Sequence, residues 1–263
     1  MEFQLQTNLL NLRASSPLVH NITNFVVMNY TANALLALGA SPVMAHALEE
    51  VEDMVAIAGA LVVNIGTLAP LWVEGMKLAM TAAANQHKPI VLDPVGAGAT
   101  PYRNHVLTSL MEAARPTIIR GNGSEILALA GASIQTKGVD STASSTDTID
   151  AARALSKRFG AVVSVSGATD VIVSGERIAY VSNGVPLMTR VTGMGCSASA
   201  IAGAYAAIVQ DPFEAAVSAA VTMGVCGELA FSNAKSPGSF QIAFLDSLAE
   251  ITPAQLAEMA EVR

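Results

Sequence analysis

The stretch at residues 191–207 holds the residue types in this chain that are best suited to chemistry. It begins Val-Thr-Gly-Met-Gly-Cys and continues into small and apolar residues with good helix-forming content. Gly193 and Gly195 would let a ligand approach the main chain closely. The first helical turn after them would offer unpaired N–H groups and the positive end of the helix dipole. We therefore predict an anion-binding turn, in which a thiolate at Cys196 would also be favoured.

Two acids and an arginine stand where other apolar runs end. Asp93 closes the run at 89–92, while Arg120 and Glu125 lie just after the run at 116–119. Two carboxylates without a histidine–cysteine metal set favour a hard cation such as Mg²⁺. Mg²⁺ together with an arginine and a helix N-terminus is the equipment of phosphoryl transfer.

Each of these residues also has a plainer interpretation. Asp93 precedes a proline and could be a turn residue or a cap, and Glu125 could simply face a helix dipole. Asn24 could cap the helix that follows it. Met44 is most often a core residue, and Cys196 could be a small buried hydrophobe. Only the joint occurrence of these residues at successive strand ends favours a functional site.

The elements that must position these residues alternate along the chain. Short apolar runs follow longer segments of helical periodicity, which predicts an α/β fold with a mostly parallel sheet. Three closely spaced strands at 161–165, 170–173 and 178–181 predict an antiparallel hairpin on the edge of that sheet. Ligands of such sheets bind beyond the carboxyl ends of the strands, where the polar residues fall, Asn64 among them.

No repeat and no domain boundary interrupts this pattern, so we expect one domain over residues 1–263. The segment 131–147 is rich in Ser, Thr, Asp and Gly, and it is predicted to be an exposed loop.

The composition points to extensive burial. Of 263 residues, 52% are hydrophobic and only 13% are charged, which indicates a large core or buried subunit contacts. The net charge is −7 and no basic run is present, so nucleic-acid binding is not expected.

A membrane protein is not expected either. Charge-free windows at 25–45, 54–73 and 191–210 are each broken by glycine, proline or asparagine, as in strand–turn–helix units. The N-terminus lacks the basic start of a secretory signal. Two cysteines without disulfide or zinc spacing suit a reducing cytoplasm.

Four segments resemble the signature blocks of the hydroxyethylthiazole kinase family, ribokinase-like enzymes of thiamine salvage. They cover residues 20–26, 92–97, 120–126 and 191–196, in matching order. The resemblance implies a ribokinase-like three-layer sandwich, with a mostly parallel central sheet flanked by helices. It also implies ATP-dependent phosphorylation of the hydroxyl of 4-methyl-5-(2-hydroxyethyl)thiazole. A homotrimer with active sites between subunits is implied as well, which would account for the low charge.

The resemblance extends to individual positions. It implies thiazole binding by Met44, Gly193 and, on a weaker match, Asn24, ATP binding by Arg120 and Ser166, and Mg²⁺ binding by Asp93 and Glu125. Cys196 stands where many ribokinase-like enzymes have an aspartate base. Because a thiol is a poor base for an alcohol, Cys196 is expected to orient or weakly assist the hydroxyl. The amides from Gly193 through Gly195 to Cys196 are expected to stabilise the moving phosphoryl group.

Three other functions compete with this interpretation. The chain could be a ribokinase-like kinase of a pyrimidine or another small alcohol, or an ATP-dependent dehydratase of hydrated nicotinamide nucleotides (NAD(P)H hydrates). Both kinds of enzyme carry an aspartate where Cys196 stands, which argues against them. A cysteine hydrolase would need a histidine beside Cys196, and His20 is the candidate.

Overall fold

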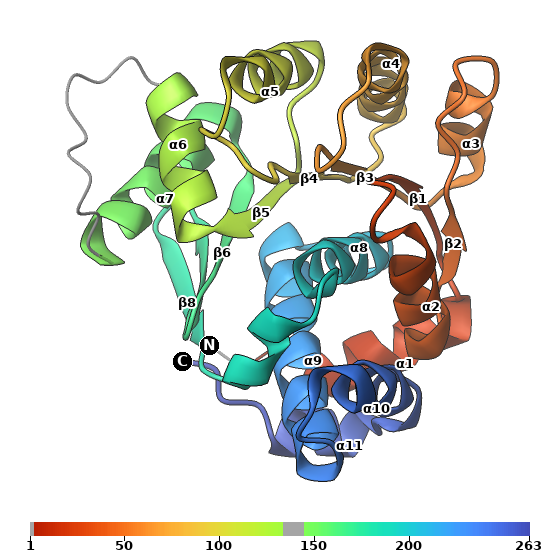
Figure 1. Ribbon diagram of the computed structural model, residues 1–263, viewed down its shortest axis with the longest axis vertical. Coiled ribbons are helices and arrows are strands. Elements are labelled where there is room, and N and C mark those ends of the chain that lie inside the picture. Colours follow the sequence, from red (N-terminus) through yellow and green to blue (C-terminus); the bar gives the residue numbers. More distant parts are fainter. Residues whose placement is uncertain (1–2, 134–144) are drawn as a thin grey trace.

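The computed structural model describes residues 3–133 and 145–263, and the strands of this part form one eight-stranded sheet (Figure 1). The strands are β1 (Leu18–Ile22), β2 (Ser41–Val43), β3 (Ala60–Asn64), β4 (Ile90–Asp93), β5 (Ile118–Asn122), β6 (Val162–Ser166), β7 (Asp170–Ser174) and β8 (Arg177–Val181). Their order is β2-β1-β3-β4-β5-β6-β7-β8. Pairing is parallel from β2 to β6 and antiparallel for β7 and β8. The predicted edge hairpin is confirmed.

Helices cover both faces of this sheet, and each face has its own hydrophobic core (Figure 1). One layer contains α3 (Val51–Ile57), α4 (Pro70–Asn85), α5 (Pro101–Ala113), α6 (Gly123–Ser133) and α7 (Ser145–Phe159). The other contains α1 (Leu5–Ser15), α2 (Met28–Leu38), α8 (Met194–Ala206), α9 (Pro212–Asn233), α10 (Pro237–Glu250) and α11 (Pro253–Glu258). A 3₁₀ helix, η1 (Pro186–Arg190), precedes α8. The predicted three-layer sandwich is therefore confirmed.

The central strands are apolar because helices cover them on both sides. Every residue of β3 and β4 is buried. Alternate side chains divide between the two cores: Val62 packs with α8, while Leu61 and Val63 pack with α3 and α4. Helix α8 lies close to the sheet, since a Cβ on Gly203 would lie 2.5 Å from Cγ2 of Val62. The N-terminal half of α8 reaches the carboxyl ends of the parallel strands, where Ser199 of α8 bonds to Asp93 at the end of β4.

Two features differ from the expectations. The segment 131–147 is not wholly a loop: α6 runs to Ser133, α7 begins at Ser145, and residues 134–144 lie outside the described part. Among the described residues, only α9 is long and apolar enough to cross a membrane, a helix that none of the three charge-free windows covers. Its most apolar window is 78% buried inside the protein, as in the core helix of a globular fold.

Candidate active site

The carboxyl ends of neighbouring strands bring three polar side chains together. Asn64 ends β3 and Asp93 ends β4, and the two residues are partners in the register of the sheet. Oδ2 of Asp93 accepts hydrogen bonds from Nδ2 of Asn64 at 2.9 Å and from Oγ of Ser199 on α8 at 2.7 Å. Both donors are 1% exposed or less. The strand-end rule therefore located Asp93 and Asn64 correctly, and the buried partner on α8 is an addition from the structure.

Burial controls the acidity of Asp93. Removal from water raises the pKa of this carboxyl to about 6, and the positive charge of Arg120 and the Ser199 hydrogen bond oppose that rise. The negative charge of Glu125 adds to the rise. At neutral pH the carboxylate is therefore ionised, and Arg120 and its hydrogen-bond donors offset only part of the cost of burying its charge.

Glu125 lies in the first turn of α6 and is held by the backbone. Its Oε1 accepts the N–H of Gly96 and its Oε2 accepts the N–H of Asn122, both at 2.9 Å. Together with Asp93 it presents hard oxygen donors that suit Mg²⁺. Among the described residues, no three histidine, cysteine or acidic side chains are grouped closely enough to hold a metal by themselves. A bound Mg²⁺ would therefore need water or ligand oxygens to complete its coordination.

The glycine turn begins α8 as predicted. Gly193 is the N-cap with φ of +87°, a conformation that glycine adopts freely. A Cβ at this position would lie 3.2 Å from the ring of Tyr30. Arg120 reaches the turn from β5 and donates a hydrogen bond from Nη1 to the carbonyl oxygen of Gly195 at 3.0 Å. The arginine and the helix N-terminus thus form one positively polarised wall.

Cys196 differs from the expectation in its acidity. Burial raises the pKa of its thiol, and the charge of Asp93 raises it further. The prediction of a favoured thiolate was wrong because desolvation and a nearby carboxylate outweigh the helix N-terminus. The sulfur lies 3.4 Å from Nδ2 of Asn24, which donates to it. Asn24 also donates to Asn64, so both N–H groups of its amide are engaged within the protein.

A cavity of about 630 Å³ opens in front of the turn. Arg120, Ser166, Gly193 and Gly195 all line it, so the structure brings four predicted residues to one space. Ser166 is anchored by its Oγ, which donates to the carbonyl oxygen of Gly121 at 3.4 Å. Apolar side chains, among them Val191, Met194 and Met223, also line the cavity, as is usual for sites that bind small molecules.

Sequence reasoning missed the far wall of this cavity. It is formed by Asp170, by the loop at 183–185 and by η1, which follows that loop. Glu228 on α9 holds this loop by accepting the N–H of Gly184 at 2.7 Å and Nδ2 of Asn183 at 3.2 Å. Gly184 followed by Pro186 marks a loop in the sequence, but no local signal pairs it with Glu228.

Five predicted site residues do not line this cavity, and neither does His20: the five are Asn24, Met44, Asp93, Glu125 and Cys196. Met44 follows the edge strand β2, is half-buried and does not line the cavity. His20 bonds through Nε2 to the carbonyl oxygen of Ala45 at 2.7 Å, and burial lowers its pKa. The hydrogen bond to Cys196 comes from Asn24 rather than from His20. The structure therefore gives no support to a cysteine–histidine hydrolase.

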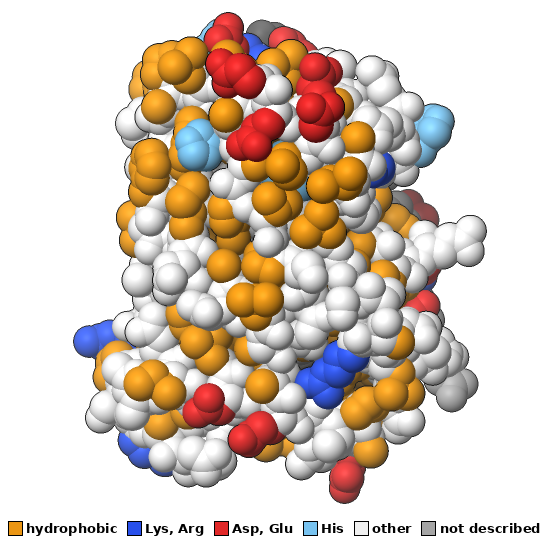
Figure 2. All heavy atoms as spheres, turned by 90° about the vertical axis from the view of Figure 1, so that its right-hand side faces the viewer, with side chains coloured by type: hydrophobic (Ala, Val, Ile, Leu, Met, Phe, Trp, Pro, Cys, Tyr) orange, Lys and Arg blue, Asp and Glu red, His pale blue; other side chains and the backbone are white. Residues whose placement is uncertain are grey.

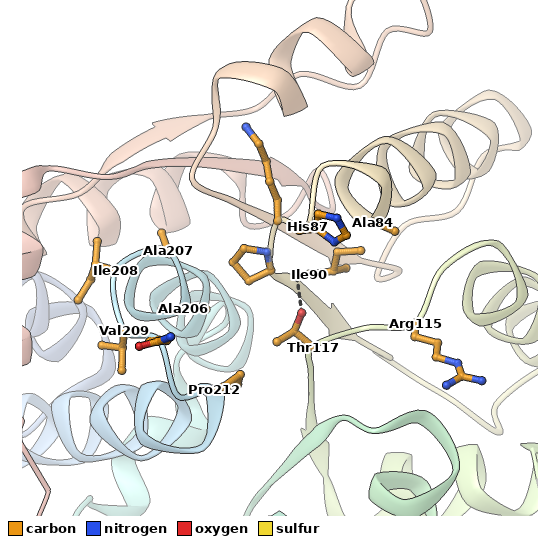
Figure 3. A pocket seen from close by; sticks show the side chains of 13 residues that line it. Ala84, His87, Ile90, Arg115, Thr117, Ala206, Ala207, Ile208, Val209 and Pro212 are labelled. Atoms are coloured by element: carbon orange, nitrogen blue, oxygen red, sulfur yellow. Dashed lines mark hydrogen bonds between the residues drawn. The ribbon is translucent and has the colours of Figure 1, made fainter.

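Another hollow, of about 740 Å³, lies at the opposite edge of the sheet, where β4 and β5 begin (Figure 3). Its walls come from the ends of α4 and α8 and from the start of α9. The ammonium of Lys88, which lies in this hollow, already donates hydrogen bonds to the carbonyl oxygens of Val55, Ala56 and Ala58. The acids and the glycine turn are at the other edge, so we assign the chemistry to that edge.

Comparison with known proteins shows the family of this chain. The sequence model of the Hydroxyethylthiazole kinase family matches residues 9–254. This chain belongs to that family. A hydroxyethylthiazole kinase of Leptospira biflexa is 57% identical over 91% of this chain and 90% of its own. One from Syntrophus aciditrophicus is 54% identical over 95% and 93% of the two chains.

Solved structures give the same assignment. The hydroxyethylthiazole kinase protein of Pyrococcus horikoshii superposes with a TM-score of 0.92 at 44% identity, and 98% of each chain is covered. A pyridoxal kinase of Bacillus subtilis, with a TM-score of 0.57 and 19% identity, shares the fold alone. A ribokinase-like superfamily protein of Enterococcus faecalis, with a TM-score of 0.66 and 12% identity over 94% of this chain and 89% of its own, also shares the fold. The ribokinase-like fold that the resemblance implied is therefore confirmed.

Proposed function

We propose that this protein transfers the terminal phosphoryl group of ATP to the hydroxyl of 4-methyl-5-(2-hydroxyethyl)thiazole, a step of thiamine salvage. The observation that carries the proposal is the wall formed by Arg120 and the N-terminus of α8 beside a cavity of about 630 Å³. Family membership supplies the substrate class.

The residues divide into two groups in this proposal. Arg120 and Ser166 contact ATP, and the backbone amides from Gly193 to Cys196 face the phosphoryl group during transfer. Positioned N–H groups and an arginine stabilise charge that spreads over the phosphoryl oxygens. Asp93 and Glu125 would hold Mg²⁺, which would neutralise phosphate charge when bound.

Cys196 acts as a neutral thiol in this mechanism. Because burial raises its pKa, the sulfur carries its proton at neutral pH. A loose transition state for phosphoryl transfer needs positioning more than early removal of the hydroxyl proton. We therefore assign Cys196 to orienting the hydroxyl of the thiazole alcohol.

We also propose that the protein is a homotrimer with its active sites at the subunit interfaces. Hydrophobic side chains are spread over the face that carries β2, α2 and α3 (Figure 2). Val26 is 70% exposed, Ile57 66% and Phe25 63%. Exposed apolar surface of this kind marks an interaction face. Met44 follows β2, so a partner subunit on this face would cover it and join it to a complete thiazole site.

The decisive experiment compares ADP release with the thiazole alcohol and with the analogue that lacks the hydroxyl. We expect ADP release that depends on the hydroxyl and on Mg²⁺. Equal ADP release from both compounds would refute the kinase assignment. A panel of pyrimidine and sugar alcohols tests the other ribokinase-like kinases, and hydrated NADH tests the dehydratase.

The quaternary proposal has its own test. Light scattering after gel filtration should give three times the mass of one chain. Val26→Asp and Ile57→Asp should lower that mass, whereas Tyr102→Asp on α5 should not. A wild-type mass of one chain would refute the trimer. Fractionation of cells should place the protein in the cytoplasm, the compartment we propose from its cysteine content.

A further inference from the structure

We propose that Asn64 is a positioning residue for the thiol of Cys196. Asp93 fixes the orientation of the Asn64 amide, Asn64 in turn fixes the orientation of the Asn24 amide, and Asn24 holds the thiol. The proposal rests on the proposed function for its consequence in catalysis. Its geometry stands on three hydrogen bonds: Asp93 to Asn64 at 2.9 Å, Asn64 to Asn24 at 2.9 Å, and Asn24 to Cys196 at 3.4 Å.

The orientation of the Asn64 amide follows from its neighbours. An ionised carboxylate only accepts hydrogen bonds, so Asn64 must turn Nδ2 toward Asp93. Its Oδ1 then faces the other way and accepts Nδ2 of Asn24 and the backbone N–H of Gly66, both at 2.9 Å. A backbone N–H cannot reverse its role, so Gly66 fixes the same orientation independently.

The amide of Asn24 is fixed in the same way. Its Oδ1 accepts the backbone N–H of Val26 at 3.2 Å, and one hydrogen of Nδ2 is directed to Asn64. The remaining hydrogen of Nδ2 can only point to Sγ of Cys196. The sulfur is thus the acceptor in this contact, which leaves the S–H free to turn toward the substrate hydroxyl.

Burial makes this arrangement costly to reverse. Asn24 is 5% exposed and Asn64 is 1% exposed, so neither amide has water as an alternative partner. A flipped amide would leave a buried donor facing a donor, with both groups unsatisfied. One orientation therefore dominates, and it places the thiol in a defined position.

Thiol alkylation tests this inference without the kinase reaction. Cys226 is fully buried, so iodoacetamide reports on Cys196 in the folded protein. The N–H from Asn24 stabilises the thiolate, so Asn64→Ala should slow alkylation at pH 8 by about three- to tenfold. Asn64 also lowers the pKa of the thiol directly, so the slowing should become smaller, by at least half on a logarithmic scale, when Asn24 is already alanine. An unchanged or faster rate, or slowing of the same size in the Asn24→Ala background, would overturn the proposal.

Ser199→Ala is the matched control. It removes the other donor to Oδ2 of Asp93 but touches neither Asn24 nor Cys196. Its alkylation rate should stay within about twofold of wild type, since Asp93 remains ionised at pH 8. If Asn64→Ala fails to fold, Asn24→Ala alone must show the slower alkylation, and a wild-type rate for that variant would equally overturn the proposal.

Steady-state kinetics tests the catalytic consequence. Asn64→Ala should lower kcat by about tenfold with little change in the KM for ATP, and Asn64→Ala with Cys196→Ala should be no slower than the slower single variant. Ser199→Ala and Cys196→Ala should multiply their losses instead. Multiplied losses for Asn64 and Cys196 would contradict the coupling. A wild-type protein without ADP release would refute the kinase function alone, because the alkylation result does not depend on it.

Discussion

Nη1 of Arg120 donates to the carbonyl oxygen of Gly195 at 3.0 Å, and this bond joins the end of β5 to the first turn of α8. Both residues line the cavity of about 630 Å³. Burial raises the pKa of Asp93, Asp170 and Cys196, and the charge of Arg120 lies close enough to oppose that rise in each. One guanidinium therefore orders the turn and offsets the negative charge around it.

Arg120→Lys tests this double role. An ammonium has no planar fork, so it cannot hold the Gly195 carbonyl and face a phosphate with the same geometry. We expect kcat/KM for ATP to fall by about 10- to 100-fold in the lysine variant and further in Arg120→Ala. Steady-state kinetics at varied ATP measures the loss, and circular dichroism checks the fold. Wild-type kinetics in the lysine variant would mean that charge alone suffices.

Asp93→Asn should raise the stability of the protein at pH 7 and lower its activity. The folded pKa of Asp93 is about 6, above its ordinary value of 3.8. The folded state therefore binds more protons than the unfolded state between these values, and its stability falls as the pH rises through them. At pH 7 the ionised side chain costs the folded state up to about 3 kcal/mol, which asparagine removes.

Denaturant unfolding at several pH values measures this effect. Asp93→Asn should be more stable than wild type at pH 7, and the gain should shrink toward pH 4. The same variant should lose about 100-fold or more in kcat, because a neutral amide is a weak partner for Mg²⁺. A variant that is less stable than wild type at pH 7 would contradict the burial cost of the charge.

Cys196→Ala should lower turnover without preventing ATP binding. A thiol that only orients the hydroxyl contributes less than a general base, so we expect a loss of about tenfold in kcat. Calorimetric titration with ATP should give the wild-type affinity. An unchanged turnover would refute a role for the thiol. Because burial raises its pKa above the ordinary value of 9.0, alkylation of Cys196 in the wild type should be slow at pH 7 and accelerate above pH 9.

Glu228→Ala should weaken ATP binding in the cavity although Glu228 does not line it. Glu228 holds Asn183 and Gly184, which line the cavity, and it does not line the cavity itself. Release of this loop should raise the KM for ATP by about three- to tenfold with little change in kcat. Glu214→Ala is the matched control on the same helix, since Glu214 accepts from the backbone of Gln4 and from Asn8 instead. Equal effects of both variants on the KM would show a general loss of stability.

Much of the fold followed from local sequence patterns. The apolar run at 89–92 predicted β4, and the closely spaced runs at 161–181 predicted the edge hairpin. Ends of helices were less predictable, since α6 and α7 extend into the stretch that was expected to be a loop. Helix periodicity weakens where Ser, Thr and Gly are frequent, so their composition resembled that of a loop.

The sequence by itself determined which residues lie at the carboxyl ends of the strands and at the start of α8. Strand ends and glycine turns are short-range features, and they located Asp93, Arg120, Gly193 and Cys196 before any contact was known. Tertiary structure alone decided what these residues do to one another. Asn24 meets Cys196 across 172 positions of the chain, and burial beside Asp93 raises the pKa of the thiol instead of lowering it. Desolvation and hydrogen-bond partners depend on neighbours in space, so no local pattern could report them.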